Sequence, residues 1–508
     1  MLSKVLTAAL YGIEGRMIIV ETDITKGLPS YNVVGLGDMV IKEAGPRVRA
    51  AIINSGIDFP RTRITVNLSP ASFPKEGSHF DMPLALGILS SAGIIPSPGG
   101  QRAFFGELSM NGDVVPVRGI LPLVICAMEQ GAKEVFVPAG NADEAALAGG
   151  VDVYPVRTLR EAAEHLYGSM TIEKRSLPGK EGAYKTIGNH NEEDFADVAG
   201  QDNVKRAMVI CAAGGHGLMM SGSPGAGKTM LARRLPGILP PLSREEMLEV
   251  TKIYSVAGLL GEEMPMITER PFRSVSHDIT RAALLGGGAK PVPGELSLAH
   301  QGVLFMDELP MFSKNVIESL RRPLEDKEVV IKRHGGSARF PANAVLLAAA
   351  NPCPCGHAGD QTKRCTCTAA QINAYERKIS DMILDRIDMH VFVQRIRYDE
   401  LSENSGYTTE KMRDQVIMAR EKQKERFGGS SMILNSSMDK VMMDEFCRLD
   451  KEGEGLMKEA YDKLPLTMRT YVKAICVART IADLDGSDNI KTSHLAEALH
   501  YRSNNTGI

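Results

Sequence analysis

The chain contains no tryptophan, and aromatic residues make up only 5% of its 508 residues. Proteins that hold single-stranded nucleic acid without reading its sequence commonly stack the bases on aromatic side chains. This chain has few such side chains to offer. If it binds nucleic acid, we expect contacts with the phosphate backbone rather than with the bases.

The sequence also lacks a long apolar stretch, because no run approaches the ~18 residues that a membrane-spanning helix needs. Its first residues, Met1–Thr7, show no secretory signal pattern. We therefore expect a cytoplasmic protein with no membrane partner. The net charge of −3 excludes a uniformly basic nucleic-acid binder, but it allows a local basic surface such as the lining of a ring's pore.

Eight cysteines in a chain expected to be cytoplasmic argue against a disulfide framework, because that compartment keeps thiols reduced. Four of them lie in apolar helical contexts typical of core residues: Cys126, Cys211, Cys447 and Cys476. The other four form two C-x-C pairs: Cys353, Cys355, Cys365 and Cys367. Four thiolates suit a structural Zn²⁺ site, in which His357 could replace one ligand. Because this spacing is tighter than usual, four reduced thiols in a loop remain an alternative.

A chain of this length exceeds a single hydrophobic core and predicts about three domains. Residues 172–193 are polar with little periodicity, as in a linker. They separate an N-terminal domain, residues 1–171, from a core at 194–398 in which strands alternate with helices. Residues 399–508 have a helical pattern. The sequence therefore predicts an α/β multidomain protein with a helical C-terminal domain.

The strongest motif matches G-x-x-x-x-G-K-S/T at every fixed position. It lies between an apolar strand pattern, Leu218–Met220, and a helical one, Met230–Leu235. In such loops, backbone N–H groups surround the phosphates, the lysine contacts the β and γ oxygens, and the final hydroxyl ligates Mg²⁺. The predicted ATP-binding residues are Gly222, Ser223, Pro224, Gly225, Ala226, Gly227, Lys228 and Thr229.

A second motif places two carboxylates after a predicted buried strand, Gly302–Met306. Asp307 is predicted to hold Mg²⁺ with Thr229, and Glu308 to polarise the water that attacks the γ-phosphate. A strand followed by a solvated acidic turn is the alternative. The phosphate-binding loop upstream makes the catalytic interpretation the stronger one.

Further motifs complete a family pattern: Pro293–Glu308, Asn351-Pro-Cys-Pro-Cys-Gly356 and Leu384-Asp-Arg-Ile-Asp388. Together with the phosphate loop, they resemble the magnesium-chelatase-like AAA+ ATPases of the YifB/ComM group over nearly the full length. The resemblance implies a ring-forming, hexameric ATPase that uses ATP and Mg²⁺. Better-studied members drive branch migration of DNA during natural transformation. The ATPase subunit of magnesium chelatase and minichromosome-maintenance helicases are more distantly similar.

Three polar residues outside the two motifs are candidates for catalysis. Asn351 follows a predicted strand, where an amide can bind the γ-phosphate or the attacking water; a turn before Pro352 is the alternative. By resemblance, Arg386 matches the arginine finger that reaches a neighbouring subunit's nucleotide, although an Arg between two Asp residues is usually a surface ion pair. Arg469 matches the sensor 2 arginine.

Two insertions suggest what such a motor would hold. Residues 274–294 resemble the helix-2 insert of the group. Residues Glu328–Phe340 alternate like a hairpin and present Lys332 and Arg333 just before the turn. In related helicases this hairpin touches DNA in the central channel. A basic turn in solvent is the alternative, since only repetition around a ring makes a phosphate-tracking stripe.

The N-terminal domain resembles the Lon-type α+β proteolytic domain over Val20–Leu166, but departs from it at the catalytic positions. The serine position falls on His79 and the lysine position on Leu121. Ser78 is adjacent, but with no lysine base nothing activates it. We expect a degenerate, non-proteolytic scaffold.

The resemblance thus implies a DNA motor, a helicase or branch-migration translocase acting on single-stranded or branched DNA in recombination or DNA uptake. The alternative is a protein-remodelling or metal-chelatase-type ATPase subunit without DNA activity. An ATP-dependent protease is disfavoured.

Overall fold

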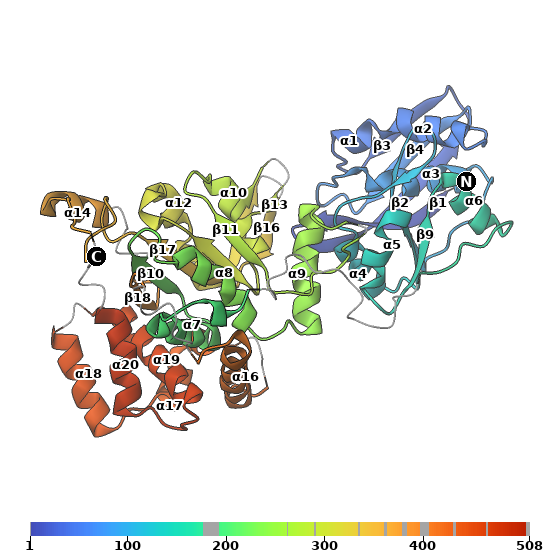
Figure 1. Ribbon diagram of the computed structural model, residues 1–508. Helices are drawn as coiled ribbons and strands as arrows, with labels where there is room; N and C mark the ends of the chain where they lie inside the picture. The colour runs from blue at the N-terminus through green and yellow to red at the C-terminus, as the bar shows by residue number, and fades with distance from the viewer. Residues whose placement is uncertain are drawn as a thin grey trace.

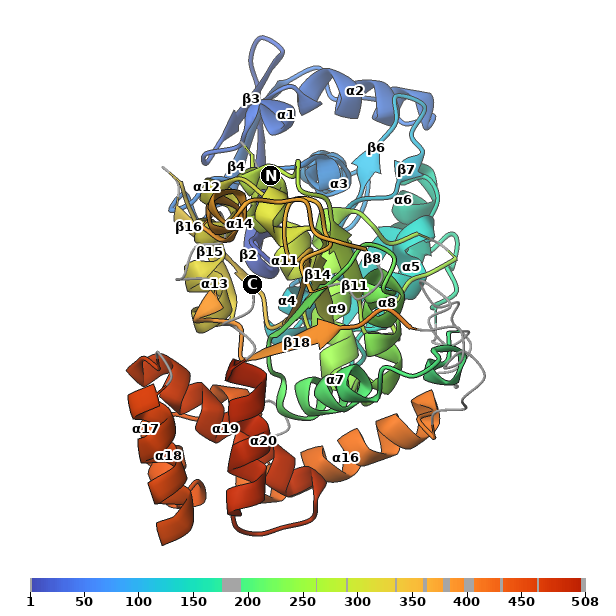
Figure 2. The same cartoon turned by 60° about the vertical axis from the view of Figure 1, so that its left-hand side comes forward.

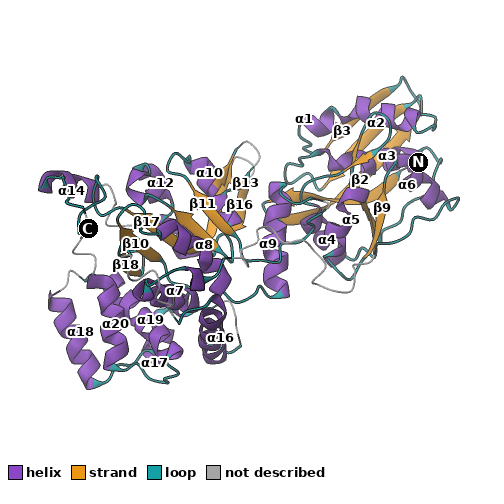
Figure 3. Ribbon diagram, in the orientation of Figure 1, coloured by secondary structure: helices purple, strands orange, loops and turns teal. Residues whose placement is uncertain are grey.

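The computed structural model describes residues 2–175, 193–261, 263–288, 291–333, 336–359, 363–377, 384–396, 406–429, 433–463 and 466–503. Two β-sheets and a helical C-terminal part organise these residues (Figure 1, Figure 3). Mixed α/β architecture with a helical C-terminus, as predicted, is confirmed. Among the described helices, none has both the length and the apolar composition needed to cross a bilayer.

The N-terminal sheet has seven strands in the order β3-β4-β2-β1-β5-β8-β9. Strands β1, β2 and β4 pair antiparallel, whereas the remaining neighbours pair parallel. The strands are β1 (Ser3–Tyr11), β2 (Glu14–Thr25), β3 (Ser30–Val34), β4 (Arg63–Ser69), β5 (Arg102–Phe104), β8 (Glu134–Pro138) and β9 (Asp152–Val156). The predicted resemblance to the Lon-type domain stays a prediction.

Helices and one small strand pair cover this sheet. Helix α3 (Asp81–Ser91) is buried along its whole length, as expected for a helix that is apolar on nearly every side. Its one carboxylate, Asp81, is paired with Arg47 at 2.6 Å. The other elements are α1 (Met39–Lys42), α2 (Ala44–Asn54), β6 (Glu107–Leu108), β7 (Val114–Val115), α4 (Ile120–Glu129), α5 (Ala142–Ala146) and α6 (Leu159–Tyr167).

The second sheet has five parallel strands in the order β11-β14-β17-β10-β18. They are β10 (Leu218–Gly222), β11 (Phe272–Val275), β14 (Val303–Met306), β17 (Val345–Ala350) and β18 (Met389–Val393). The central strands are apolar and buried, as a sheet covered on both faces requires. Because β17 lies between β10 and β14 and all three strands are parallel, their carboxyl ends lie side by side at the same edge of the sheet.

Helices surround the second sheet, and two short hairpins extend from it. The helices are α7 (Asp202–Gly214), α8 (Lys228–Ile238), α9 (Arg244–Ala257), α10 (Arg281–Leu285), α11 (Glu295–Leu298), α12 (Lys314–Ser319), α13 (Arg321–Asp326) and α14 (Ala369–Glu376). The hairpins are β12 (Gly286–Gly287) with β13 (Val292–Pro293), in the predicted insert, and β15 (Glu328–Arg333) with β16 (Gly336–Pro341).

The C-terminal helices pack beside α7 and β18 of the second sheet (Figure 2). They are α16 (Thr409–Arg426), α17 (Lys440–Phe446), α18 (Lys451–Lys463), α19 (Met468–Leu484) and α20 (Thr492–Ser503). Val416 and Ala474 belong to the same hydrophobic cluster as Val209 of α7 and Leu347 of β17. The helical part therefore shares a core with the sheet.

Helix α9 joins the two sheets (Figure 1). Its start is fixed by a capping box between Ser243 and Glu246. Near its end, the Ser255 hydroxyl donates to the buried carboxylate of Glu144, and the Ser255 carbonyl accepts from the Gly119 N–H at 3.1 Å. Helix α9 therefore contacts the N-terminal part directly through hydrogen bonds near its end.

Candidate functional site

The phosphate-loop motif connects β10 to α8, the strand and helix that the sequence predicts there. Gly225 and Gly227 have φ of 77° and 91°, a region that only glycine adopts at low cost. A Cβ on either would meet nothing within 4 Å, so this part of the loop borders open space. A Cβ on Gly222 would lie 2.3 Å from the Val393 carbonyl, so that glycine allows close packing against β18.

Lys228 is buried at the start of α8. Its ammonium donates to the carbonyl of Ser223 at 3.1 Å and to Oδ1 of Asn351 at 3.2 Å. Burial lowers the pKa of Lys228, while Asp307 and Glu308 oppose that shift. The structure therefore brings together the lysine, the amide after β17 and the two carboxylates after β14.

Thr229 and Asp307 are also in contact. The Thr229 hydroxyl donates to Oδ2 of Asp307 at 3.0 Å, and Oδ1 of Asp307 accepts from the Glu308 N–H at 2.9 Å. A hydroxyl and a carboxylate are the oxygen ligands that Mg²⁺ takes in phosphate-loop ATPases. These side chains fit the predicted magnesium pair.

Glu308 has φ of 53°, a left-handed conformation that is uncommon for a residue with a side chain. Its carboxylate is exposed. It faces an open pocket of ≈ 520 Å³ whose lining residues come from the ends of two strands and from α14. They are Glu308, Met311, Asn351, Pro354, Gln371, Ala374 and Tyr375. The predicted catalytic carboxylate and the predicted sensor amide thus border the same space.

Arg386 and Arg469 lie together rather than at the phosphate loop's lysine. Both donate to Oε1 of Glu325 on α13, Arg386 at 2.8 Å. Arg386 is buried, and burial lowers its pKa, with Glu325 opposing. The sequence did not predict a role for Glu325, because it lies 61 residues before Arg386 and outside the motif that contains this arginine. The structure therefore defines an arginine pair with a shared anion.

Asp388 fixes the segment that bears Arg386. It is buried, and it accepts from His216 at 3.1 Å and from Lys473, whose ammonium also donates to the Arg386 carbonyl. Although burial opposes ionisation, Lys473 and His216 hold the pKa of Asp388 well below its usual range. The ionised form is thus stabilised by folding.

We predict that Asp388→Asn lowers the free energy of unfolding by about 3 kcal/mol, because it leaves the half-buried Lys473 without its buried anion. Asp485→Asn is the matched control: this exposed carboxylate pairs with Arg206 at 3.3 Å and should matter by less than about 1 kcal/mol. Calorimetry at neutral pH measures both. Because folding lowers the pKa of Asp388 below its unfolded value of about 4, the stabilisation is complete above that pH and is lost as pH falls toward the folded pKa. The Asp388→Asn difference should therefore shrink below about pH 4. If the two proteins differ in unfolding free energy by the same amount at neutral pH and below about pH 4, Asp388 is not the stabilising anion proposed here.

The predicted basic hairpin is confirmed as an element, since β15 and β16 pair antiparallel with Arg333 opposite Gly336. Lys332 is exposed on β15. Residues 334 and 335 at the turn, and the side chain of Arg333, lie outside the described part. The Ser337 N–H donates to the Tyr11 hydroxyl at 3.0 Å, so the N-terminal part braces this hairpin.

The three residues that the predicted Lon resemblance places at or beside catalytic positions lie in other contacts here. The Ser78 hydroxyl donates to the Glu107 carboxylate, and a ring nitrogen of His79 lies 2.9 Å from the Ala8 carbonyl. Leu121 is fully buried. Ser78 and His79 therefore make structural hydrogen bonds, and Leu121 is part of the core.

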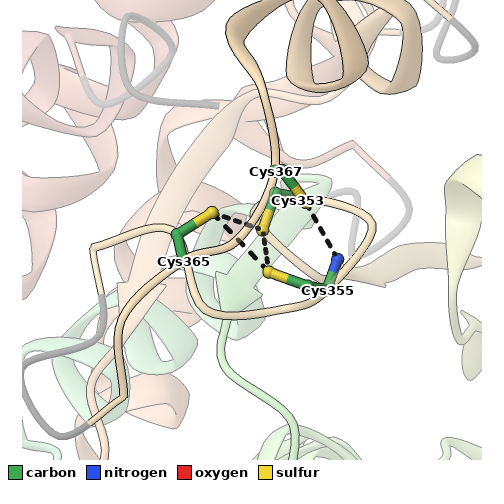
Figure 4. Close-up of side chains that lie close together, drawn as sticks. All are labelled: Cys353, Cys355, Cys365 and Cys367. Atoms are coloured by element: carbon green, nitrogen blue, oxygen red, sulfur yellow. Dashed lines mark hydrogen bonds between the residues drawn. The ribbon is translucent and has the colours of Figure 1, made fainter.

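The four clustered cysteines come together after β17 (Figure 4). Their sulfur atoms all lie within 4.8 Å of one another. The amide N–H groups of Thr366 and His357 donate to the Cys355 sulfur and lower the pKa of Cys355 to about 5. The other four cysteines are buried, as predicted. The cluster could hold a metal ion such as zinc.

Comparison with known proteins covers almost the whole chain. Residues 194–401 match the family model "Magnesium chelatase, subunit ChlI", residues 20–141 match "Subunit ChlI of Mg-chelatase", and residues 406–502 match "Magnesium chelatase, subunit ChlI C-terminal".

Three relatives are similar over their full length. An uncharacterized protein of Mycobacterium tuberculosis is 41% identical over 99% of this chain and 98% of its own length. The competence protein ComM of Haemophilus influenzae and the uncharacterized protein YifB of Escherichia coli are each 38% identical over 99% of this chain and 97% of their own. The chain therefore belongs to the magnesium-chelatase-like AAA+ ATPase family that includes YifB and ComM.

Proposed function

We propose that this protein hydrolyses ATP at the phosphate-loop site and uses the energy to move DNA. One observation carries the proposal. At the carboxyl edge of three adjacent parallel strands, the structure places close together Lys228, the Thr229–Asp307 pair, Glu308 and Asn351. Phosphoryl transfer needs mainly positioning and charge neutralisation, and this set of side chains supplies both.

Each residue would have one role toward the triphosphate. The loop Gly222–Thr229 would surround the phosphates with backbone N–H groups, and Lys228 would exchange its carbonyl and amide partners for the β and γ oxygens. Thr229 and Asp307 would hold Mg²⁺, which would neutralise negative charge on the phosphates. Glu308 would polarise the attacking water, and Asn351 would hold that water or the γ-phosphate.

The assembly that we propose is a homo-oligomeric ring, with six subunits by analogy to the family. Arg386 and Arg469 would serve the nucleotide of the next subunit, since both lie at Glu325 rather than at their own Lys228. We also propose the division into residues 1–171, a linker 172–193, an ATPase core 194–398 and a helical domain 399–508. The N-terminal domain would be a non-proteolytic scaffold, and the protein would act in the cytoplasm.

The DNA part of the proposal rests on the full-length similarity to a competence protein and on the basic hairpin. Exposed Lys332, together with Arg333 at the end of β15, would contact DNA phosphates when repeated around a ring. Single-stranded or branched DNA in a central pore is the substrate that we propose, in branch migration or translocation during recombination or DNA uptake.

We predict that Lys332→Ala combined with Arg333→Ala lowers DNA-stimulated ATP hydrolysis at least about tenfold. The slope of log DNA affinity against log salt concentration should fall by about two, since two phosphate contacts are lost. Phosphate release with and without four-way DNA measures the first effect. Arg339→Ala is the matched control, because this cation of β16 is paired with Glu328 at 3.0 Å on the same hairpin. Stimulation that survives the double change would exclude the hairpin as the DNA contact.

A protein-remodelling or chelatase-type ATPase subunit is the second candidate, favoured by the three family models that carry the ChlI description. It predicts stimulation of ATP hydrolysis by a partner protein. No response to single-stranded, forked or four-way DNA would favour this function over a DNA motor.

A further inference from the structure

The cysteine cluster has the dimensions of a closed tetrahedral thiolate site. The sulfur of Cys353 lies 3.4 Å from that of Cys355 and 3.7 Å from that of Cys365, and the sulfurs of Cys355 and Cys365 are 3.6 Å apart. Bonds of ~2.3 Å to a central Zn²⁺ place tetrahedral ligands about 3.8 Å apart. The fourth sulfur, of Cys367, lies within 4.8 Å of the others (Figure 4).

We propose that Cys353, Cys355, Cys365 and Cys367 bind one Zn²⁺, and that the zinc-bound loop acts as a structural support for the nucleotide site. Thiolates are soft ligands that select zinc over magnesium or calcium. Four protein ligands leave no open position for water or substrate, which makes the site structural rather than catalytic.

The backbone around the cluster is arranged for charged sulfur atoms. Four thiolates and one Zn²⁺ would leave two negative charges that the protein must offset. The Ala358 N–H donates to the Cys353 sulfur at 3.3 Å, and the Cys355 N–H donates to the Cys367 sulfur at 3.4 Å. Such N–H groups orient metal ligands and spread their charge. Lys363 and Arg364 directly precede Cys365 and add positive charge nearby.

The cluster joins two elements that form the candidate ATP site. Its first pair follows Asn351 at the end of β17, and its second pair ends at the Thr368 cap of α14. Helix α14 supplies Gln371 and Tyr375 to the pocket that Glu308 and Asn351 border. The Asn351 N–H also bonds to the Tyr375 hydroxyl. A metal that ties β17 to α14 therefore fixes one wall of that pocket.

The same loop touches the phosphate loop. A Cβ on Gly356, between the two cysteine pairs, would lie 2.5 Å from Cδ of Pro224, and Gly356 has φ of 79°. Only glycine allows this close approach at low cost. The zinc-bound loop and the phosphate loop therefore pack as two parts of one surface. This second half of the inference rests on the proposed ATPase function, whereas the zinc site stands without it.

Metal content tests the site independently of any activity. Elemental analysis of the full chain, purified without chelator, should find one zinc per chain, and Cys365→Ser should reduce zinc at least about tenfold. Cys447→Ser is the matched control, since this thiol lies outside the cluster and should leave zinc unchanged. Metal-free chain, or iron in place of zinc, would overturn the proposal.

A measurement on the unmodified chain covers the case in which Cys365→Ser does not fold. Titration with a mercurial that blocks thiols should release zinc in step with modification of the four clustered cysteines. Replacement by Co²⁺ should give the visible absorbance of a tetrahedral cobalt–thiolate centre. Zinc released only after modification of Cys126, Cys211, Cys447 or Cys476 would overturn the assignment.

Gly356→Ala tests the support of the nucleotide site separately. The added methyl group should push the loop away from Pro224 while the four sulfurs keep their zinc. We expect one zinc per chain and an apparent affinity for ATP that falls about tenfold. Zinc retained with ATP affinity as in the parent chain would overturn the coupling but leave the site. A parent chain that holds zinc and hydrolyses no ATP would instead count against the proposed function.

Discussion

Glu308→Gln is expected to lower the ATPase turnover number by about 100- to 10,000-fold, while ATP still binds. Glutamine keeps the shape of the side chain but cannot take a proton from the attacking water. Lys228 and the Thr229–Asp307 pair, which would hold the triphosphate and Mg²⁺, are unchanged. Phosphate release measures turnover, and a fluorescent ATP analogue measures binding.

Two comparisons make this result specific. Glu318→Gln removes the same charge from exposed α12, where Glu318 pairs with Lys314 at 3.7 Å, and should leave turnover within about twofold. Lys228→Ala should abolish binding as well as turnover, because the buried ammonium is the main cation within the loop. If Glu308→Gln turns over ATP at the parent rate, another group polarises the water and the proposed site is wrong.

The two contiguous motifs were predictable because their chemistry needs neighbouring residues. A phosphate loop requires glycines, lysine and a hydroxyl within eight positions, so Gly222–Thr229 could be recognised without knowledge of the fold. Asp307 and Glu308 could be assigned because a buried strand ends at Met306. What the sequence does not contain is the strand order that places β17 between β10 and β14 and so brings Asn351 to Lys228.

Partners far apart in the chain were beyond prediction. Glu325 joins Arg386 and Arg469, which are 61 and 144 residues away from it, and a lone glutamate on a helix gives no signal of such a role. The packing of Gly356 on Pro224 depends equally on the tertiary fold. Residues 176–192 of the predicted linker 172–193 lie outside the described part. Arg175, within the predicted linker, forms a β-bridge with Val153 of β9 and therefore packs on the N-terminal sheet.

Arg386→Ala is expected to reduce ATP turnover by about a thousandfold or more in the assembled protein. An arginine finger neutralises charge that develops only during phosphoryl transfer, so ATP binding should change far less than turnover. Arg160→Ala is the matched control: this exposed cation of α6 pairs with Glu164 at 2.7 Å and should leave turnover unchanged. Equal losses of binding and turnover would indicate a structural role instead.

A structural role is a serious alternative, because Arg386 is buried and shares Glu325 with Arg469. A mixture of two inactive variants separates the possibilities. Lys228→Ala subunits keep Arg386 but lack a working phosphate loop, and Arg386→Ala subunits have the opposite defect. In an equal mixture, about a quarter of the sites would combine an intact loop with an intact neighbouring arginine. Recovered hydrolysis would show that Arg386 acts across the subunit boundary. Mixed rings, verified with two affinity tags, that hydrolyse no ATP would contradict an arginine finger, and with it the proposed ring mechanism.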